Sequence, residues 1–160
     1  MNDNLICKHP IDDLCDLAAR LDDVYRVFAK RYGETYLSMW CIEELGKRPE
    51  GLMQKQICEL LYLPKQTTSS MVSSLENRGL VVTEPSKTDK RSKVHMLTSA
   101  GRAIYEKVSV DMDRCNEAAV NEVGEAALAE AIGLMGKALD CVDRMLEEEA
   151  VEASRKKKRK

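Results

Sequence analysis

A run of short polar side chains at residues 65–70 gives the clearest chemical signal in this sequence. Hydroxyl and amide groups donate and accept hydrogen bonds without bulk, which suits them to base edges and phosphate oxygens. The residues expected to face a DNA major groove are Lys65, Gln66, Thr67, Thr68, Ser69, Ser70 and, one helical turn later, Ser73. Taken alone, the run is equally typical of the capped and solvated start of a helix.

A basic loop at residues 85–92 separates these two explanations. It holds Lys87, Lys90 and Arg91 between two β-rich runs. An arginine at a loop tip can enter a minor groove, where the potential is most negative, and Asp89 can orient Arg91 through a charge-assisted hydrogen bond. The polar run and the basic loop together predict binding to double-stranded DNA.

The elements that position these residues are predicted by local signals. Pro64 forces a turn between two helices, Gly79 suits the left-handed position that ends the second helix, and Thr98 is a good cap for a later one. The expected order is a helix over 54–61, a helix over 65–78, strands over 80–84 and 93–97, and a helix over 99–119. A winged helix-turn-helix has this order, with its second helix in the major groove and its hairpin loop against the flanking backbone.

The two ends of the chain carry apolar seams. Apolar residues recur at spacings of three and four over 11–32 and 128–146, a pattern that seeks a partner helix. Packing within the chain would satisfy it, but a symmetric homodimer is the simpler expectation for two long helices. The predicted fold is therefore mostly α with a small β wing. Its expected parts are an N-terminal dimerisation helix (1–34), a winged helix-turn-helix DNA-binding lobe (35–101), linker and C-terminal dimerisation helices (102–150) and a basic disordered tail (151–160).

The charge distribution agrees with a DNA-binding lobe. The net charge is −2, but residues 47–102 hold ten Lys/Arg against five Asp/Glu, so that segment carries +5 and the rest −7. One Phe and one Trp are too few for a base-stacking platform, which argues against a single-strand binder.

Other functional classes find little support in the sequence. We find no nucleophile–base pair, zinc-ligand spacing or phosphate-cradling loop, and so predict no enzyme, no cofactor and no metal. No signal peptide or membrane-spanning run is visible, and six scattered cysteines are typical of free thiols, so we expect a cytoplasmic protein.

The winged segment resembles the MarR (multiple antibiotic resistance regulator) family. The likeness covers about 11–146 and is most specific over 65–101, in the order Leu75-Glu76, Gly79, Asp89-Lys90-Arg91, Leu97-Thr98 and Gly101. It implies a homodimeric bacterial transcriptional regulator, usually a repressor, that binds a palindromic operator and is released by a small ligand or by oxidation. The sequence departs from the family at Ser70 and Ser74, where many relatives carry Arg or Lys.

The resemblance also suggests where a signal would enter. Relatives bind effectors between the dimer helices and the winged lobe, where Tyr36, Met39 and Trp40 are candidates here, although such a stripe is more often core. Cys15 is similar to the reactive cysteine of peroxide-sensing relatives, with Tyr36 as a possible hydroxyl donor, but three nearby aspartates disfavour its thiolate. A third possibility is a winged helix that binds a protein and never reads bases, which the charge-poor second helix would favour.

Overall fold

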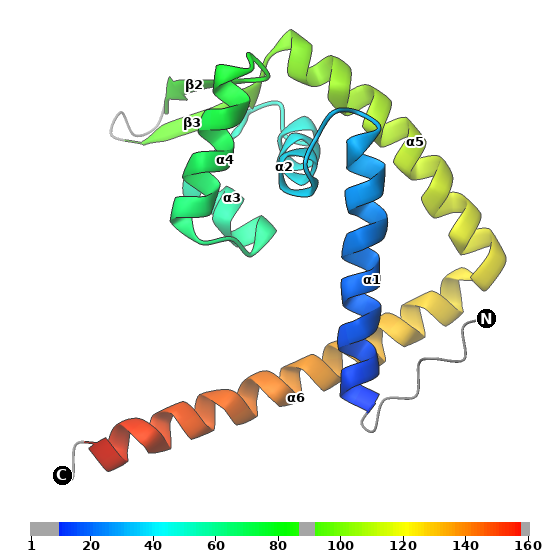
Figure 1. The fold of residues 1–160 in the computed structure, drawn as a ribbon, viewed down its shortest axis with the longest axis vertical. Coiled ribbons are helices and arrows are strands. Elements are labelled where there is room, and N and C mark those ends of the chain that lie inside the picture. The colour runs from blue at the N-terminus through cyan, green and yellow to red at the C-terminus, as the bar shows by residue number, and fades with distance from the viewer. Residues whose placement is uncertain (1–9, 87–91, 158–160) are drawn as a thin grey trace. The chain divides into compact units, whose positions relative to one another are not determined.

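The structure, a computed structural model, describes residues 10–86 and 92–157. Within these residues the chain forms six helices and a three-stranded sheet (Figure 1), which confirms the predicted fold class. The elements in order are α1 (Pro10–Lys30), α2 (Tyr36–Gly46), β1 (Leu52–Met53), α3 (Gln54–Leu61), α4 (Lys65–Asn77), β2 (Val81–Pro85), β3 (Lys93–Leu97), α5 (Ser99–Val123) and α6 (Glu125–Lys157).

Two compact units share these elements. One unit is Arg20–Cys115 and contains all three strands, whereas the other joins the start of the chain to its end, from Asn116 onward. The first unit is wider than the predicted lobe of 35–101, because the second half of α1 and the first part of α5 supply part of its core. None of the helices in the described residues is long and apolar enough to cross a membrane.

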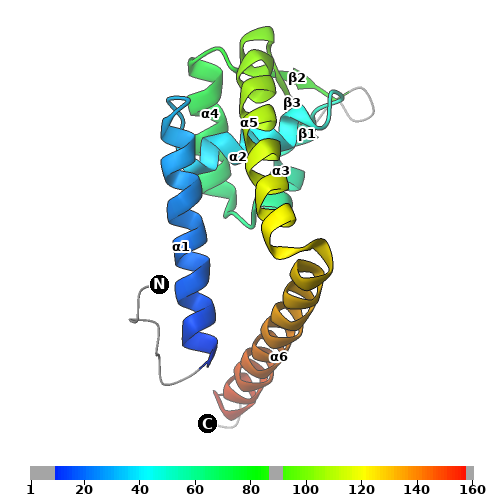
Figure 2. The ribbon, with the colours of Figure 1, turned by 90° about the vertical axis from the view of Figure 1, so that its right-hand side faces the viewer.

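The sheet is antiparallel in the order β1-β3-β2 (Figure 2). Strands β2 and β3 form the predicted hairpin, with Val81 opposite Leu97 and Pro85 opposite Lys93. The added strand β1 places Leu52 opposite His95. Two residues are too few to show an alternating pattern, which is why the sequence did not predict this strand.

Two apolar clusters form the core of the Arg20–Cys115 unit. The larger one gathers α2, α3, α4 and the sheet, and its members are Cys41, Ile42, Leu45, Leu52, Ile57, Met71, Val72, Leu75, Leu80 and Val81. The smaller one is built by α1, α2 and α5 around Ala29, Met39, Val108 and Met112, with Tyr25, Phe28 and Tyr32 packed against it. The last three belong to the seam predicted for a dimer, so that part of the seam is satisfied within the chain.

The C-terminal end corrects one prediction. Residues 151–157, expected to be a disordered tail, continue α6 to Lys157. The sequence after Gly136 has no Gly or Pro to stop the helix.

Candidate nucleic-acid interface

Helix α4 has one buried and one exposed face. Its apolar face packs into the core through Met71, Val72 and Leu75. Of the predicted contact residues, Lys65, Gln66, Ser69, Ser70 and Ser73 are exposed on the other face, while Thr67 is half-buried. These side chains form a short, small-residue polar surface with one cation, which can meet base edges and phosphates without steric conflict.

Thr68 does not belong to this surface, and its placement there was wrong. Its side chain is fully buried. The hydroxyl donates to the carbonyl of Pro64 at 3.2 Å and accepts from the Cys58 thiol at 3.3 Å. Thr68 lies three, four and seven residues before the buried apolar residues of α4, which puts it on their face of the helix.

The turn between α3 and α4 determines where the exposed polar face of α4 lies. Tyr62 ends α3 in the left-handed conformation, with φ at 52°, and its own side chain is 93% exposed. Helix α4 then begins at Lys65 behind Pro64, and the Gln54 side chain donates to the carbonyl of Lys65 at 3.0 Å. The first turn of α4 is therefore held against the start of α3, with its polar residues outward.

The wing is the hairpin of β2, β3 and their connection. The amide of Ser86 donates to the carbonyl of Ser92 at 2.8 Å, at the loop end of the hairpin. The four predicted wing contacts, Lys87, Asp89, Lys90 and Arg91, lie outside the described residues. The strands thus carry the predicted loop, and its DNA contacts stay a prediction.

A chain of hydrogen bonds joins the wing to α4. The Thr83 hydroxyl donates to the Glu76 carboxylate, and the same oxygen lies 2.7 Å from Nδ1 of His95. Because the hydroxyl proton goes to Glu76, Thr83 accepts from an Nδ1–H, which fixes the tautomer of a neutral imidazole. Burial lowers the pKa of His95, against the opposing attraction of Glu76.

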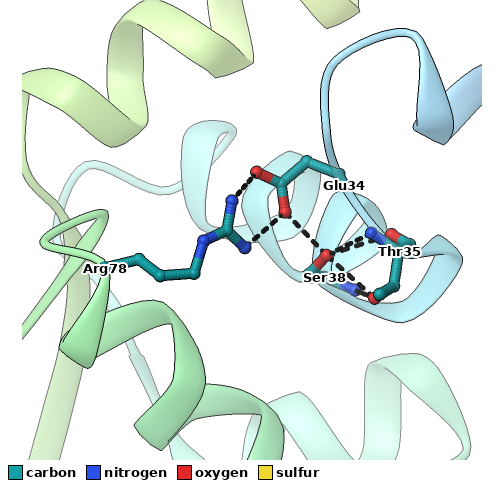
Figure 3. Close-up of polar contacts among 4 residues, drawn as sticks. All are labelled: Glu34, Thr35, Ser38 and Arg78. Atoms are coloured by element: carbon teal, nitrogen blue, oxygen red, sulfur yellow. Dashed lines mark hydrogen bonds and ion pairs between the residues drawn. The ribbon is translucent and has the colours of Figure 1, made fainter.

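Arg78 at the end of α4 is committed to an internal partner. Its guanidinium donates to both carboxylate oxygens of Glu34, with 2.8 Å between Nη1 and Oε2 (Figure 3). This bond raises the pKa of Arg78 above its ordinary value. The sequence did not predict this pair, because no local pattern links residues 44 positions apart.

The three residues predicted to contact an effector differ in how far they are buried. Met39 is fully buried in the core. Trp40 is half-buried and packs edge-on against Tyr25 and Tyr36, with ring centroids 5.3 Å and 6.2 Å apart. The Tyr36 hydroxyl donates to Asp22 at 2.9 Å. Burial is the larger cause, and this hydrogen bond the smaller one, of a pKa of Tyr36 above its ordinary value. Tyr36 also lines an open hollow of about 640 Å³ beside Arg26 and Lys30.

The cysteines differ in what chemistry their surroundings allow. Cys15 is exposed. Cys41 is buried, and burial raises the pKa of its thiol to about 12, so it stays protonated and unreactive at neutral pH. Cys58 is engaged between α3 and α4 through Thr68.

Comparison with known proteins agrees with this geometry. Residues 32–92 match the sequence model of the MarR family, which confirms the resemblance seen in the sequence. The solved structure of the transcriptional regulator SlyA has 18% identity and a TM-score of 0.69, over 86% of this chain and 96% of that one. No curated protein matched the sequence.

Two further structures share the fold and contain ligands. The complex of Staphylococcus aureus MepR with DNA has 20% identity and a TM-score of 0.68, over 79% of this chain and 96% of that one. The PcaV transcriptional regulator of Streptomyces coelicolor, in complex with its natural ligand, has 23% identity and a TM-score of 0.67, over 89% of this chain and 99% of that one. These similarities establish a MarR-like winged-helix fold.

Proposed function

We propose, from the MarR-family segment at residues 32–92, that this chain is a sequence-specific regulator of transcription that binds double-stranded DNA. One observation carries the proposal: α4 turns a small polar face outward while its other face is locked into the core. A helix of this kind, followed by a hairpin wing, is built to lie in a major groove. The cytoplasmic, non-enzymatic role expected from the sequence fits this function.

The proposed acting species is a homodimer on a palindromic operator. Exposed apolar side chains in the described residues support it, among them Leu17, Leu21, Val24 and Val27 on α1, and Ile132, Leu139 and Leu146 on α6. Apolar surface of this extent favours burial against another copy. A two-fold axis would present two α4 helices to half-sites spaced by about 10 bp or a multiple of it.

The proposed activity is repression that a small ligand relieves. The aromatic group of Tyr25, Tyr36 and Trp40, beside an open hollow, supports a ligand site in the same unit as α4. Release by oxidation of Cys15 is the alternative, which its exposure favours. A winged helix that binds only protein is the second alternative, and the single cation on the exposed face of α4 favours it.

Selection and titration test the DNA-binding proposal. The full-length protein is used to enrich duplexes from a random library, and binding of the enriched duplex is followed by fluorescence anisotropy with random-sequence competitor. We expect a complex that resists competitor and weakens steeply between about 50 and 200 mM salt. Equal affinity for enriched and random duplexes would reject sequence-specific regulation and favour the protein-binding alternative.

A further inference from the structure

The last turn of α4 is held from outside the helix by a buried carboxylate. Glu34 lies in the linker between α1 and α2, and its side chain is 0% exposed, against 41% for Arg78. The guanidinium grips the carboxylate through two nitrogens, and the Ser38 hydroxyl donates to Oε2 at 2.7 Å (Figure 3). Both carboxylate oxygens are therefore satisfied.

This arrangement leaves Arg78 little freedom. A buried carboxylate is costly unless it is paired and hydrogen-bonded. Arg78 neutralises the charge of Glu34, so a movement of the end of α4 would leave a buried carboxylate without its cationic partner. The two-pronged bond also fixes orientation, because a planar guanidinium meets a carboxylate in one plane.

The linker that carries Glu34 is itself fixed. The amide of Glu34 donates to the carbonyl of Ala29 at 3.1 Å. The next residue, Thr35, caps α2 and exchanges hydrogen bonds with Ser38 in both directions, at 2.9 Å and 3.1 Å. These hydrogen bonds link Glu34 to the end of α1 and to the start of α2. Through its bonds to Glu34, Arg78 attaches the end of α4 to the same linker.

The opposite side of the same turn is attached to the wing. Glu76, two residues before Arg78, accepts from Thr83 of β2. The end of α4 is therefore a junction, with the wing on one side and the α1–α2 linker on the other. Helix α4 has 13 residues and is about 20 Å long, so a rotation of about 5° at this end moves its first turn by roughly 2 Å.

We propose that Glu34 is a positioning residue for DNA recognition, which holds the end of α4 through Arg78 and so sets the angle of its groove-facing surface. The inference rests on the proposed function. It assigns the guanidinium of Arg78 to the buried carboxylate of Glu34 and not to a DNA phosphate. Base contacts depend on this angle because hydrogen bonds to base edges are directional, whereas non-specific phosphate attraction tolerates a small tilt.

The test compares Glu34→Gln with wild type in the full-length protein. Binding is measured to the duplex that wild type selects from a random library and to a random-sequence duplex. We expect the dissociation constant for the selected duplex to rise about tenfold. Affinity for random duplex and the salt slope should stay unchanged, because no phosphate contact is lost. Glu34→Asp keeps the charge but has a shorter side chain, and it should also raise the dissociation constant for the selected duplex. It replaces Glu34→Gln in the test if Glu34→Gln folds poorly.

Glu44→Gln is the matched control. Glu44 is also largely shielded and accepts from two cations, Lys47 at 3.0 Å and Arg48 at 2.5 Å, but these partners lie at the end of α2. We expect Glu44→Gln to lower thermal stability without changing the ratio of the two affinities. Equal changes of that ratio in both variants, or equal loss of both affinities in Glu34→Gln, would overturn the proposal.

Arg78→Gln separates positioning from direct contact. We expect it to reproduce the loss of Glu34→Gln with an unchanged salt slope. A slope reduced by about one unit would mean that Arg78 binds a phosphate, and would overturn the assignment. If wild type itself prefers no duplex, the proposed function fails, and the positioning role falls with it. If wild type discriminates and Glu34→Gln matches Glu44→Gln, the positioning role alone fails.

Discussion

At the scale of single residues, two neighbours on α4 differ in exposure, and we expect one to contact DNA and the other to stabilise the fold. Ser69 is exposed on the polar face, whereas Thr68 is buried and hydrogen-bonded between α3 and α4. We expect Ser69→Ala to raise the dissociation constant for the selected duplex by roughly threefold to tenfold, about 1 kcal/mol for one lost hydrogen bond. Stability to urea should barely change. Fluorescence anisotropy and urea unfolding measure the two quantities.

The reverse pattern is expected for Thr68→Ala. Loss of a buried, bonded hydroxyl and its methyl group should lower the free energy of unfolding by about 1–2 kcal/mol. The ratio of specific to non-specific affinity should remain that of wild type. A change of this ratio without a change in stability would mean that Thr68 reaches DNA after all, and that its burial is not maintained in the complex.

His95 makes the lobe sensitive to acid. Because burial lowers its pKa in the folded protein, the unfolded chain takes up a proton first as pH falls through the ordinary histidine value of about 6.5. The contribution of His95 to stability is therefore present above that value and is lost as pH falls further. We expect His95→Gln to lose less stability than wild type between pH 7.5 and about 5.5, measured by urea unfolding.

The chain's other histidine provides the control. His9→Gln should keep the full pH dependence of wild type, although His9 lies outside the described residues. An identical pH dependence in wild type and His95→Gln would refute this role. The acid sensitivity would then belong to the carboxylates.

At the scale of elements, local signals and distant contacts differ in what a sequence reveals. Helix α3 spans Gln54–Leu61, as predicted, because the following Pro64 forces the chain to turn. The Glu34–Arg78 pair was beyond prediction, since its partners meet only once the lobe is folded. Thr68 could have been placed correctly, because its spacing from Met71, Val72 and Leu75 already puts it on the buried face.

The junction of β3 and α5 depends on a close backbone approach. Gly101 lies in the first turn of α5, and a Cβ there would sit 2.1 Å from the carbonyl oxygen of Leu80. Since a backbone atom cannot move aside as a side-chain tip can, we expect Gly101→Ala to lower the free energy of unfolding by about 1–3 kcal/mol. Urea unfolding at fixed protein concentration measures the change.

Gly133 in α6 is the matched control. Among the described residues, no atom beyond its own helix backbone and chain neighbours lies within 4 Å of a Cβ at this position. Because alanine favours a helix over glycine, Gly133→Ala should stabilise the protein by about 0.5–1 kcal/mol. Destabilisation by both substitutions would argue against a specific close approach at Gly101.

At the scale of the whole molecule, the apolar and the charged surfaces suit the two different partners proposed above. The segment 47–102 carries +5 and the remainder −7, so the winged segment holds the net positive charge that the proposed binding to DNA needs. Ile132, Leu139 and Leu146 recur at intervals of seven on α6 and are exposed. A stripe with this spacing is typical of a helix that pairs with another helix.

A charge placed on this stripe should dissociate the proposed homodimer. We expect the double variant Leu139→Glu and Leu146→Glu to weaken self-association at least tenfold, because each carboxylate would be buried without a partner. Sedimentation velocity across a protein concentration series measures the effect. Lys137→Glu, on the opposite side of α6, should leave association intact, which separates the stripe from helix charge in general.

Two outcomes would contradict this prediction. Unchanged association of the double variant would mean that α6 does not form the interface. A monomeric variant that still bound a two-half-site duplex as tightly as wild type would show that dimerisation is not needed for DNA binding, because a dimer binds both half-sites in one event.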